Sequence, residues 1–193
     1  MTYPSRSPIV LRRFAANESG VSAVEFAMLL PLMITLYLGS VEITQAVSAD
    51  RKMSLVASTV GDLVARTDTS CISESEILTT FKAGNAVLYP FDATKMKIVI
   101  TQAIVDDKQQ AKVVEGSSGN GGWSRAYNGA TKHSGDVTAA IPPELRTTEG
   151  PVIWAEANYT YVPTIGKIIA KDGINLGETI FLKPRSGKKI PIC

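Results

Sequence analysis

The sequence predicts an α+β protein in which a long N-terminal transmembrane and stalk helix leads into a C-terminal antiparallel sheet domain. Two observations support this class. A block without a charged residue, residues 26–41, lies near the N-terminus and is followed by apolar residues at helical spacing. Farther along, runs rich in β-branched and aromatic residues alternate with turn-forming segments, a pattern typical of antiparallel strands.

The uncharged block is long enough to cross a membrane. One helix over residues 21–43 would be about 34 Å long, and the hydrocarbon core of a bilayer is about 30 Å thick. Arg6, Arg12 and Arg13 precede the block. Basic residues concentrate on the cytoplasmic side of membrane spans, so we expect the N-terminus in the cytoplasm and a single pass.

A cleaved secretory signal peptide is the rival interpretation of this block. The upstream arginines would be its basic region, and the small residues at 47–49 would be its cleavage site. However, the block exceeds the usual apolar region of about 7–15 residues, and Glu25 interrupts its start. The helical pattern also continues past the proposed site, so we predict a retained helix.

The helix is expected to continue to about Arg66, with an amphipathic second half. Ser73 and Glu76 form the pattern of a capping box, which predicts a short helix to about Ala83 that ends near Gly84.

Strands are expected next. Residues 96–105 and 109–115 would form a hairpin, and residues 151–162 and 176–183 would add further strands. We expect loops over residues 116–122 and 128–151. The simplest architecture is an antiparallel sheet packed on the amphipathic half of the helix, with the large aromatic side chains in its core and cross-strand pairs (Trp123, Trp154, Tyr159 and Tyr161).

Composition gives little support to an enzyme or to a nucleic-acid-binding protein. The 193 residues carry a net charge of +2, too weak a field to imply a nucleic-acid partner. The basic residues near the C-terminus are interpreted as a solubilising tail (Lys183, Arg185, Lys188 and Lys189). Metal-site spacing is missing, and His133 lies in a polar stretch where we expect it to be solvated. The glycines of residues 116–122 lack the Lys and Ser/Thr of a phosphate-binding loop. We therefore expect no enzyme activity, no cofactor and no metal.

The sequence contains two cysteines, Cys71 and Cys193. If the domain faces an oxidising compartment, one disulfide between them is the natural expectation. Two unpaired, buried thiols are the alternative.

Residues 20–26 read GVSAVEF, a glycine followed by four residues, a glutamate and an aromatic, at the start of an apolar helix. This pattern resembles the processing site of type IV pilin-like proteins. The longer run over residues 19–43, which includes Pro31 and Glu42, resembles the TadE/TadG family of pseudopilins of the Tad (Flp) pilus system. A weaker resemblance lies near the C-terminus, where strands close on Pro184 and Arg185.

The resemblance implies a pilin-like organisation with a cytoplasmic leader (1–20), a transmembrane and stalk helix (21–67) and a periplasmic α+β domain (68–193). A prepilin peptidase would cut after Gly20 and make Val21 the new N-terminus. Glu25, followed by Phe26, would pair with the amine of a neighbouring subunit. Glu42 is either a second pairing site or a marker of the outer interface.

The resemblance also implies partners. These are the bacterial inner membrane, the prepilin peptidase, other pilin or pseudopilin subunits and the Tad secretion machinery, in a structural role in pilus biogenesis or adhesion. The alternative function is an unprocessed, membrane-tethered periplasmic binding or scaffold module.

Overall fold

The computed structural model describes residues 19–67, 71–115, 121–163 and 172–193. The leader expected over residues 1–20 and the loop expected over 116–122 lie mostly outside these ranges. The chain forms two compact units, Met1–Thr44 and Gln45–Cys193. The described part of the first, residues 19–44, is called the anchor segment below, and the second unit is called the head.

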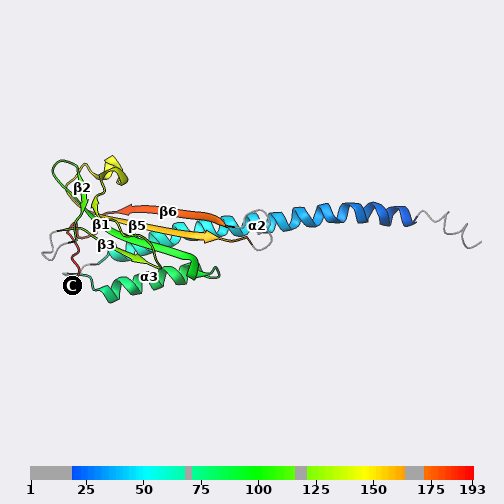
Figure 1. Ribbon diagram of the computed structural model, residues 1–193, viewed down its shortest axis with the longest axis horizontal. Coiled ribbons are helices and arrows are strands. Elements are labelled where there is room, and N and C mark those ends of the chain that lie inside the picture. The colour runs from blue at the N-terminus through cyan, green and yellow to red at the C-terminus, as the bar shows by residue number, and fades with distance from the viewer. Residues whose placement is uncertain (1–18, 68–70, 116–120, 164–171) are drawn as a thin grey trace, which may run out of the picture. The chain divides into compact units, whose positions relative to one another are not determined.

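Helix α2, Ser19–Ala65, runs through the anchor segment and supplies the first element of the head (Figure 1). Its bounds confirm the single long helix expected from the sequence, and Pro31 lies inside it. Within the head, α2 buries one face at helical spacing (Ala49, Met53, Val56, Ala57, Val60 and Val64).

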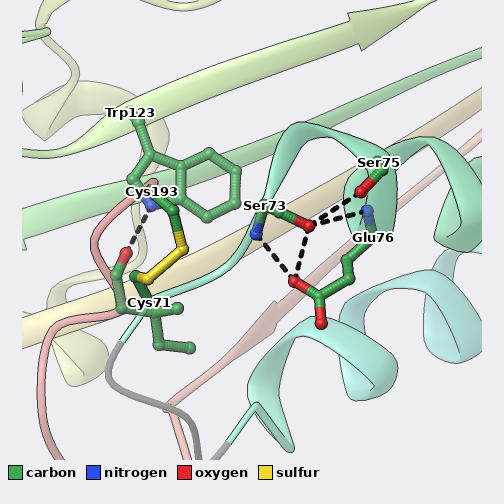
Figure 2. Close-up of a disulfide and its surroundings, with 7 residues drawn as sticks. Cys71, Ser73, Ser75, Glu76, Trp123 and Cys193 are labelled. Atoms are coloured by element: carbon green, nitrogen blue, oxygen red, sulfur yellow. Dashed lines mark hydrogen bonds between the residues drawn. A yellow bond between two sulfur atoms is a disulfide. The ribbon is translucent and has the colours of Figure 1, made fainter.

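Helix α3, Glu74–Leu88, begins with the predicted capping box. The Ser73 hydroxyl accepts a hydrogen bond from the Glu76 amide, and the Glu76 carboxylate accepts one from the Ser73 amide at 2.7 Å (Figure 2). The predicted end near Ala83 was wrong, because the helix continues through Gly84. A Cβ at Gly84 would lie 3.0–3.3 Å from side-chain atoms of Val56, Val60 and Ile98, so this glycine permits close packing and does not terminate the helix.

The sheet is antiparallel throughout and has the strand order β4-β2-β1-β5-β6. Strand β3 pairs with β1 beside β2. The strands are β1 (Met96–Val105), β2 (Ala111–Val113), β3 (Trp123–Tyr127), β4 (Gly135–Asp136), β5 (Gly150–Tyr161) and β6 (Ile174–Leu182). Short 3-10 helices occur at η1 (Ala93–Lys95), η2 (Thr138–Ala140) and η3 (Pro143–Leu145). Strands β1, β2, β5 and β6 match the predicted strands, whereas β3 and β4 were not predicted.

Two apolar clusters cover the two faces of the sheet. On one face, α2 and α3 pack on β1 and β5, with Ile98, Ile100 and Ile153 fully buried between them. On the other face, the connection between β3 and β5 packs Val137 and Ile141 against Val152 and Trp154. The predicted packing of α2 on an antiparallel sheet is therefore confirmed, and the sheet is buried on both faces.

The C-terminal residues are tied back to the start of α3. Cys71 and Cys193 form a disulfide across a sequence separation of 122 (Figure 2). Ile72 and Ile192 form a parallel β-bridge next to these cysteines in the sequence. Ile190 is anchored separately: its amide donates to Gln102 Oε1 at 2.8 Å, and its carbonyl accepts from Trp123 Nε1 at 2.7 Å. Both hydrogen bonds are buried, so Ile190 is part of the core of the head.

Candidate membrane segment and processing site

The anchor segment exposes apolar side chains on every side of the helix. Val24, Leu29, Leu32 and Leu36 are each more than half exposed, and Met28 is 78% exposed. A helix that is apolar all round and is not covered by its own chain requires a lipid environment or other apolar helices around it. This is the one helix in the described part of the chain that is long and apolar enough to span a membrane.

Three hydroxyl groups within the anchor segment are satisfied by the helix itself. Thr35 donates to the Pro31 carbonyl, Ser40 to the Tyr37 carbonyl and Thr44 to the Ser40 carbonyl, each at 2.8 Å. A hydroxyl that bonds to the preceding turn does not need water. These polar residues are therefore compatible with a low-dielectric surrounding.

The residues of the predicted processing motif lie on the first turns of α2. Gly20 is exposed, and a Cβ built on it would meet no atom within 4 Å. No contact among the described residues therefore requires glycine at this position. Val21 and Glu25 are separated by four residues on a continuous helix, which places both on the same face, and Phe26 is 60% exposed.

Glu42 lies near the other end of the anchor segment, about 26 Å along the helix from Glu25. Its Oε1 atom is shielded from solvent and has no hydrogen-bond partner within the described ranges. A shielded carboxylate oxygen without a partner is costly, so the described residues by themselves do not complete the environment of Glu42.

His133 is half-buried and has fixed partners, so the prediction of a solvated side chain was wrong. Its ring stacks on Trp154 with the centroids 4.0 Å apart, and Nε2 lies 2.8 Å from Glu156 Oε2. Its backbone amide donates to Ser124 Oγ, which is also hydrogen-bonded to Thr101. The partners come from β3 and β5, so sequence neighbourhood gave no sign of them.

This group does not form a hydrolase triad. The Ser124 hydroxyl, which is buried, contacts the backbone of His133 and not its ring. Among the residues that the structure describes, no group of three or more His, Cys, Asp or Glu side chains could hold a metal ion.

Part of the basic C-terminal segment makes specific contacts. Arg185 donates a hydrogen bond to Asp62 Oδ1 at 2.9 Å, and Arg66 contacts Asp62 Oδ2 at 2.7 Å. The hydrogen bond from Arg185 holds the pKa of Asp62 below its ordinary value, with a further contribution from Arg66. The interpretation as a purely solubilising tail is thus wrong for Arg185.

A second ion-pair group was missed because its members are far apart in the sequence. Arg125, on β3, donates to Glu74 of α3 and to Glu115. The hydrogen bond from Arg125 lowers the pKa of Glu74, and the same bond raises the pKa of Arg125. This group joins the first turn of α3 to the sheet.

The arrangement defines a class of protein: an α+β head, closed by a disulfide, that follows an apolar helix compatible with a single-pass membrane anchor. Residues 20–62 match the model of a family described as TadE-like protein. The match confirms the resemblance seen in the sequence and is consistent with a TadE-like pseudopilin, a family that implies association with a Tad pilus. No curated protein and no solved structure matches the chain.

Proposed function

We propose that the chain is a minor pseudopilin of a Tad (Flp) pilus system, held in the bacterial inner membrane by the anchor segment. Its N-terminus lies in the cytoplasm and its head in the periplasm. The observation that carries the proposal is the coincidence, on one continuous helix, of an apolar surface that the chain leaves exposed, a glycine–glutamate processing motif and the TadE-like match over residues 20–62.

The geometry of the motif supports prepilin-type processing. Cleavage after Gly20 would leave an ammonium group on Val21 at the end of the exposed helix. A carboxylate beside the apolar block costs a few kcal/mol when it is alone, and an opposite charge reduces this cost. Glu25 and the new amine would stand one turn apart on the same face, available to the complementary groups of a neighbouring subunit. Such pairing favours one register between adjacent helices.

The disulfide supports a periplasmic head. Disulfides persist in oxidising compartments and are rare in the cytoplasm. The three arginines upstream of the apolar block independently favour a cytoplasmic N-terminus. The two observations agree on the same orientation of the helix.

Intact mass and N-terminal sequence of the protein from native membranes test the proposal. A chain that begins at Val21 is the expected result, and Gly20→Leu should abolish the cut. Gly39→Leu is the matched control, because Gly39 also lies on the anchor segment and a Cβ there meets nothing within 4 Å. A wild-type chain that retains Met1 would overturn the proposal and leave an unprocessed membrane-tethered module.

If the cut is confirmed, Glu25→Ala tests the pairing step. The altered chain should still reach the membrane and should fail to assemble into pili. Normal pilus formation by this variant would remove the proposed role of Glu25.

A further inference from the structure

Strand β6 is an edge strand whose one protecting charge is Glu178. Within the described ranges it pairs with β5 alone, over the nine residues from Ile174 to Leu182. Long edge strands are commonly blunted by lysine, proline or a bulge. β6 contains neither lysine nor proline, and Glu178 at its centre is its one charged residue. Its outer edge therefore presents backbone donors and acceptors that a further strand can use.

A groove follows this edge. It lies between β6 and the last turns of α2, has a volume of about 540 Å³ and is lined by Ser58, Thr59, Leu63, Ile180 and Leu182, with Asp62 and Arg66 at one end. All of these residues belong to the head. The apolar part of the lining is formed by Ile180 and Leu182 of β6 and by Leu63 of α2, which is 42% exposed. An exposed strand edge beside a groove that can take alternate side chains is the arrangement that binds extended peptides by strand addition.

The alternation along β6 shows which of its side chains face the groove. Glu178, Ile180 and Leu182 pair with Ala157, Ala155 and Ile153, of which Ala157 and Ile153 belong to the cluster under α2. The first three side chains therefore lie on the face of the sheet that α2 covers. A strand added to β6 would place every second side chain in line with them.

Charge is distributed unevenly beside the groove. Glu178, two residues before the lining residue Ile180, accepts a hydrogen bond from Ser54 and carries the one charge on β6. At the end near Leu182, two guanidinium groups, Arg66 and Arg185, share the single carboxylate of Asp62. Both arginine side chains are more than half exposed, so they keep free donors and an excess positive charge. The edge is therefore acidic at Glu178 and basic near Leu182.

A second copy of the same strand fits this pattern poorly. Glu178 is the central residue of β6. A symmetric antiparallel β6–β6 pair over the full length of the strand would therefore place two Glu178 carboxylates directly opposite each other, which is destabilising.

We propose that the β6 edge and its groove bind an extended segment of a different protein, added antiparallel to β6, with the pattern acidic–x–apolar–x–basic. The antiparallel direction follows the rest of the sheet and forms the more stable ladder. The basic residue lies opposite Glu178, the apolar residue opposite Ile180 inserts in the groove, and the acidic residue opposite Leu182 meets Arg66 and Arg185. The inference rests on the proposed function only in placing such a partner in the periplasm, and it names the chemistry by which the head recognises that partner.

The full chain in detergent micelles is tested with a synthetic peptide of nine residues that carries an N-terminal fluorescein label and a C-terminal amide. Threonine occupies its odd positions, and aspartate, valine, lysine and threonine occupy positions two, four, six and eight. The control peptide has the same composition with aspartate and lysine exchanged. We expect the first peptide to bind at least tenfold more tightly by fluorescence anisotropy. We also expect it to slow amide hydrogen exchange in residues 174–182 and not in β4 at the opposite edge.

A charge-inverted variant makes the test specific. Arg66→Glu and Arg185→Glu combined with Glu178→Lys should reverse the preference and favour the control peptide. All three positions are at the surface or half-buried, and tryptophan fluorescence reports whether the fold is kept. Equal binding of the two peptides by the wild-type chain, or unchanged exchange in residues 174–182, would overturn the proposal whether or not the variant folds.

The two proposals fail separately. A chain cut after Gly20 that ignores both peptides would remove the docking site and leave the pseudopilin. A chain that retains Met1 and binds the first peptide selectively would do the reverse.

Discussion

Replacing both Cys71 and Cys193 with serine should lower the free energy of unfolding of the head by about 2–5 kcal/mol. The bridge joins positions 122 residues apart. For a closed loop of this length, the chain-entropy relation gives about 5 kcal/mol at 25 °C, and measured effects usually fall below that limit. The effect arises mainly because the unfolded chain regains the freedom that the cross-link had removed.

The native contacts around the bridge should survive this change. Trp123 and Gln102 hold Ile190 by two hydrogen bonds, and Ile72 exchanges backbone hydrogen bonds with Pro191 and Cys193. Because these contacts do not need the sulfur atoms, the variant should keep the wild-type fluorescence of Trp123. The loss should therefore appear in the urea midpoint, with little change in the native baseline.

Urea unfolding of the full chain in micelles, followed by tryptophan fluorescence, measures the effect. Reductant should lower the midpoint of the wild type toward that of the double variant and leave the variant unchanged. An unchanged slope of the unfolding free energy against urea concentration would show that the substitution alters stability and not the compactness of the unfolded state. A difference below about 1 kcal/mol between the two chains would refute the loop-closure reasoning.

Two further predictions concern α3. Gly84→Val should destabilise the head by about 1–3 kcal/mol, because the new methyl groups would overlap with Val60 and Ile98. Ala86→Val is the control, because Ala86 is exposed on the same helix and the change should cost only a few tenths of a kcal/mol in helix propensity. Urea unfolding compares the stability of the two variants. The pKa of Glu74 is depressed below 4.5 in the folded chain, so its contribution to stability is present above that value and is lost as the pH falls through the folded pKa. Arg125→Gln should make the free energy of unfolding less dependent on pH below about 4.5. If this free energy falls with pH in the variant as it does in the wild type, the Arg125–Glu74 ion pair does not contribute to the pH dependence of stability.

Elements with strong local signals were predictable from the sequence. The β-branched run of β1 and the alternation along β5 gave strands within a residue or two of their observed bounds, because side chains on a two-sided sheet follow a period of two. The capping box at Ser73 and Glu76 located the start of α3 for a similar reason, since both partners lie within one turn.

Features that depend on distant partners were not predictable. Strand β3 is short and carries the polar residues Ser124 and Arg125, so it lacks a strong strand signal. Its identity as a strand depends on pairing with β1, and its polar residues are satisfied by Thr101 and Glu74. The prediction for His133 failed for the same reason, because its partners Trp154 and Glu156 lie on β5, more than 20 residues away in the sequence.

The helical glycines show where sequence and structure together decide a functional question. Gly84 and Gly61 look like helix-weakening residues, yet a Cβ at Gly61 would lie 2.6 Å from Leu182 Cδ1, so packing explains both. Gly20 lies at the second position of α2 and meets nothing within 4 Å, so no packing contact in the described part of the chain accounts for it. The processing proposed above would account for it, because a residue without a side chain lets a peptidase reach the backbone closely. Gly39 shares the open surroundings but lies amid the apolar block, where small residues allow helices to pack closely. Comparing Gly20→Leu with Gly39→Leu therefore separates access by a peptidase from contact between helices.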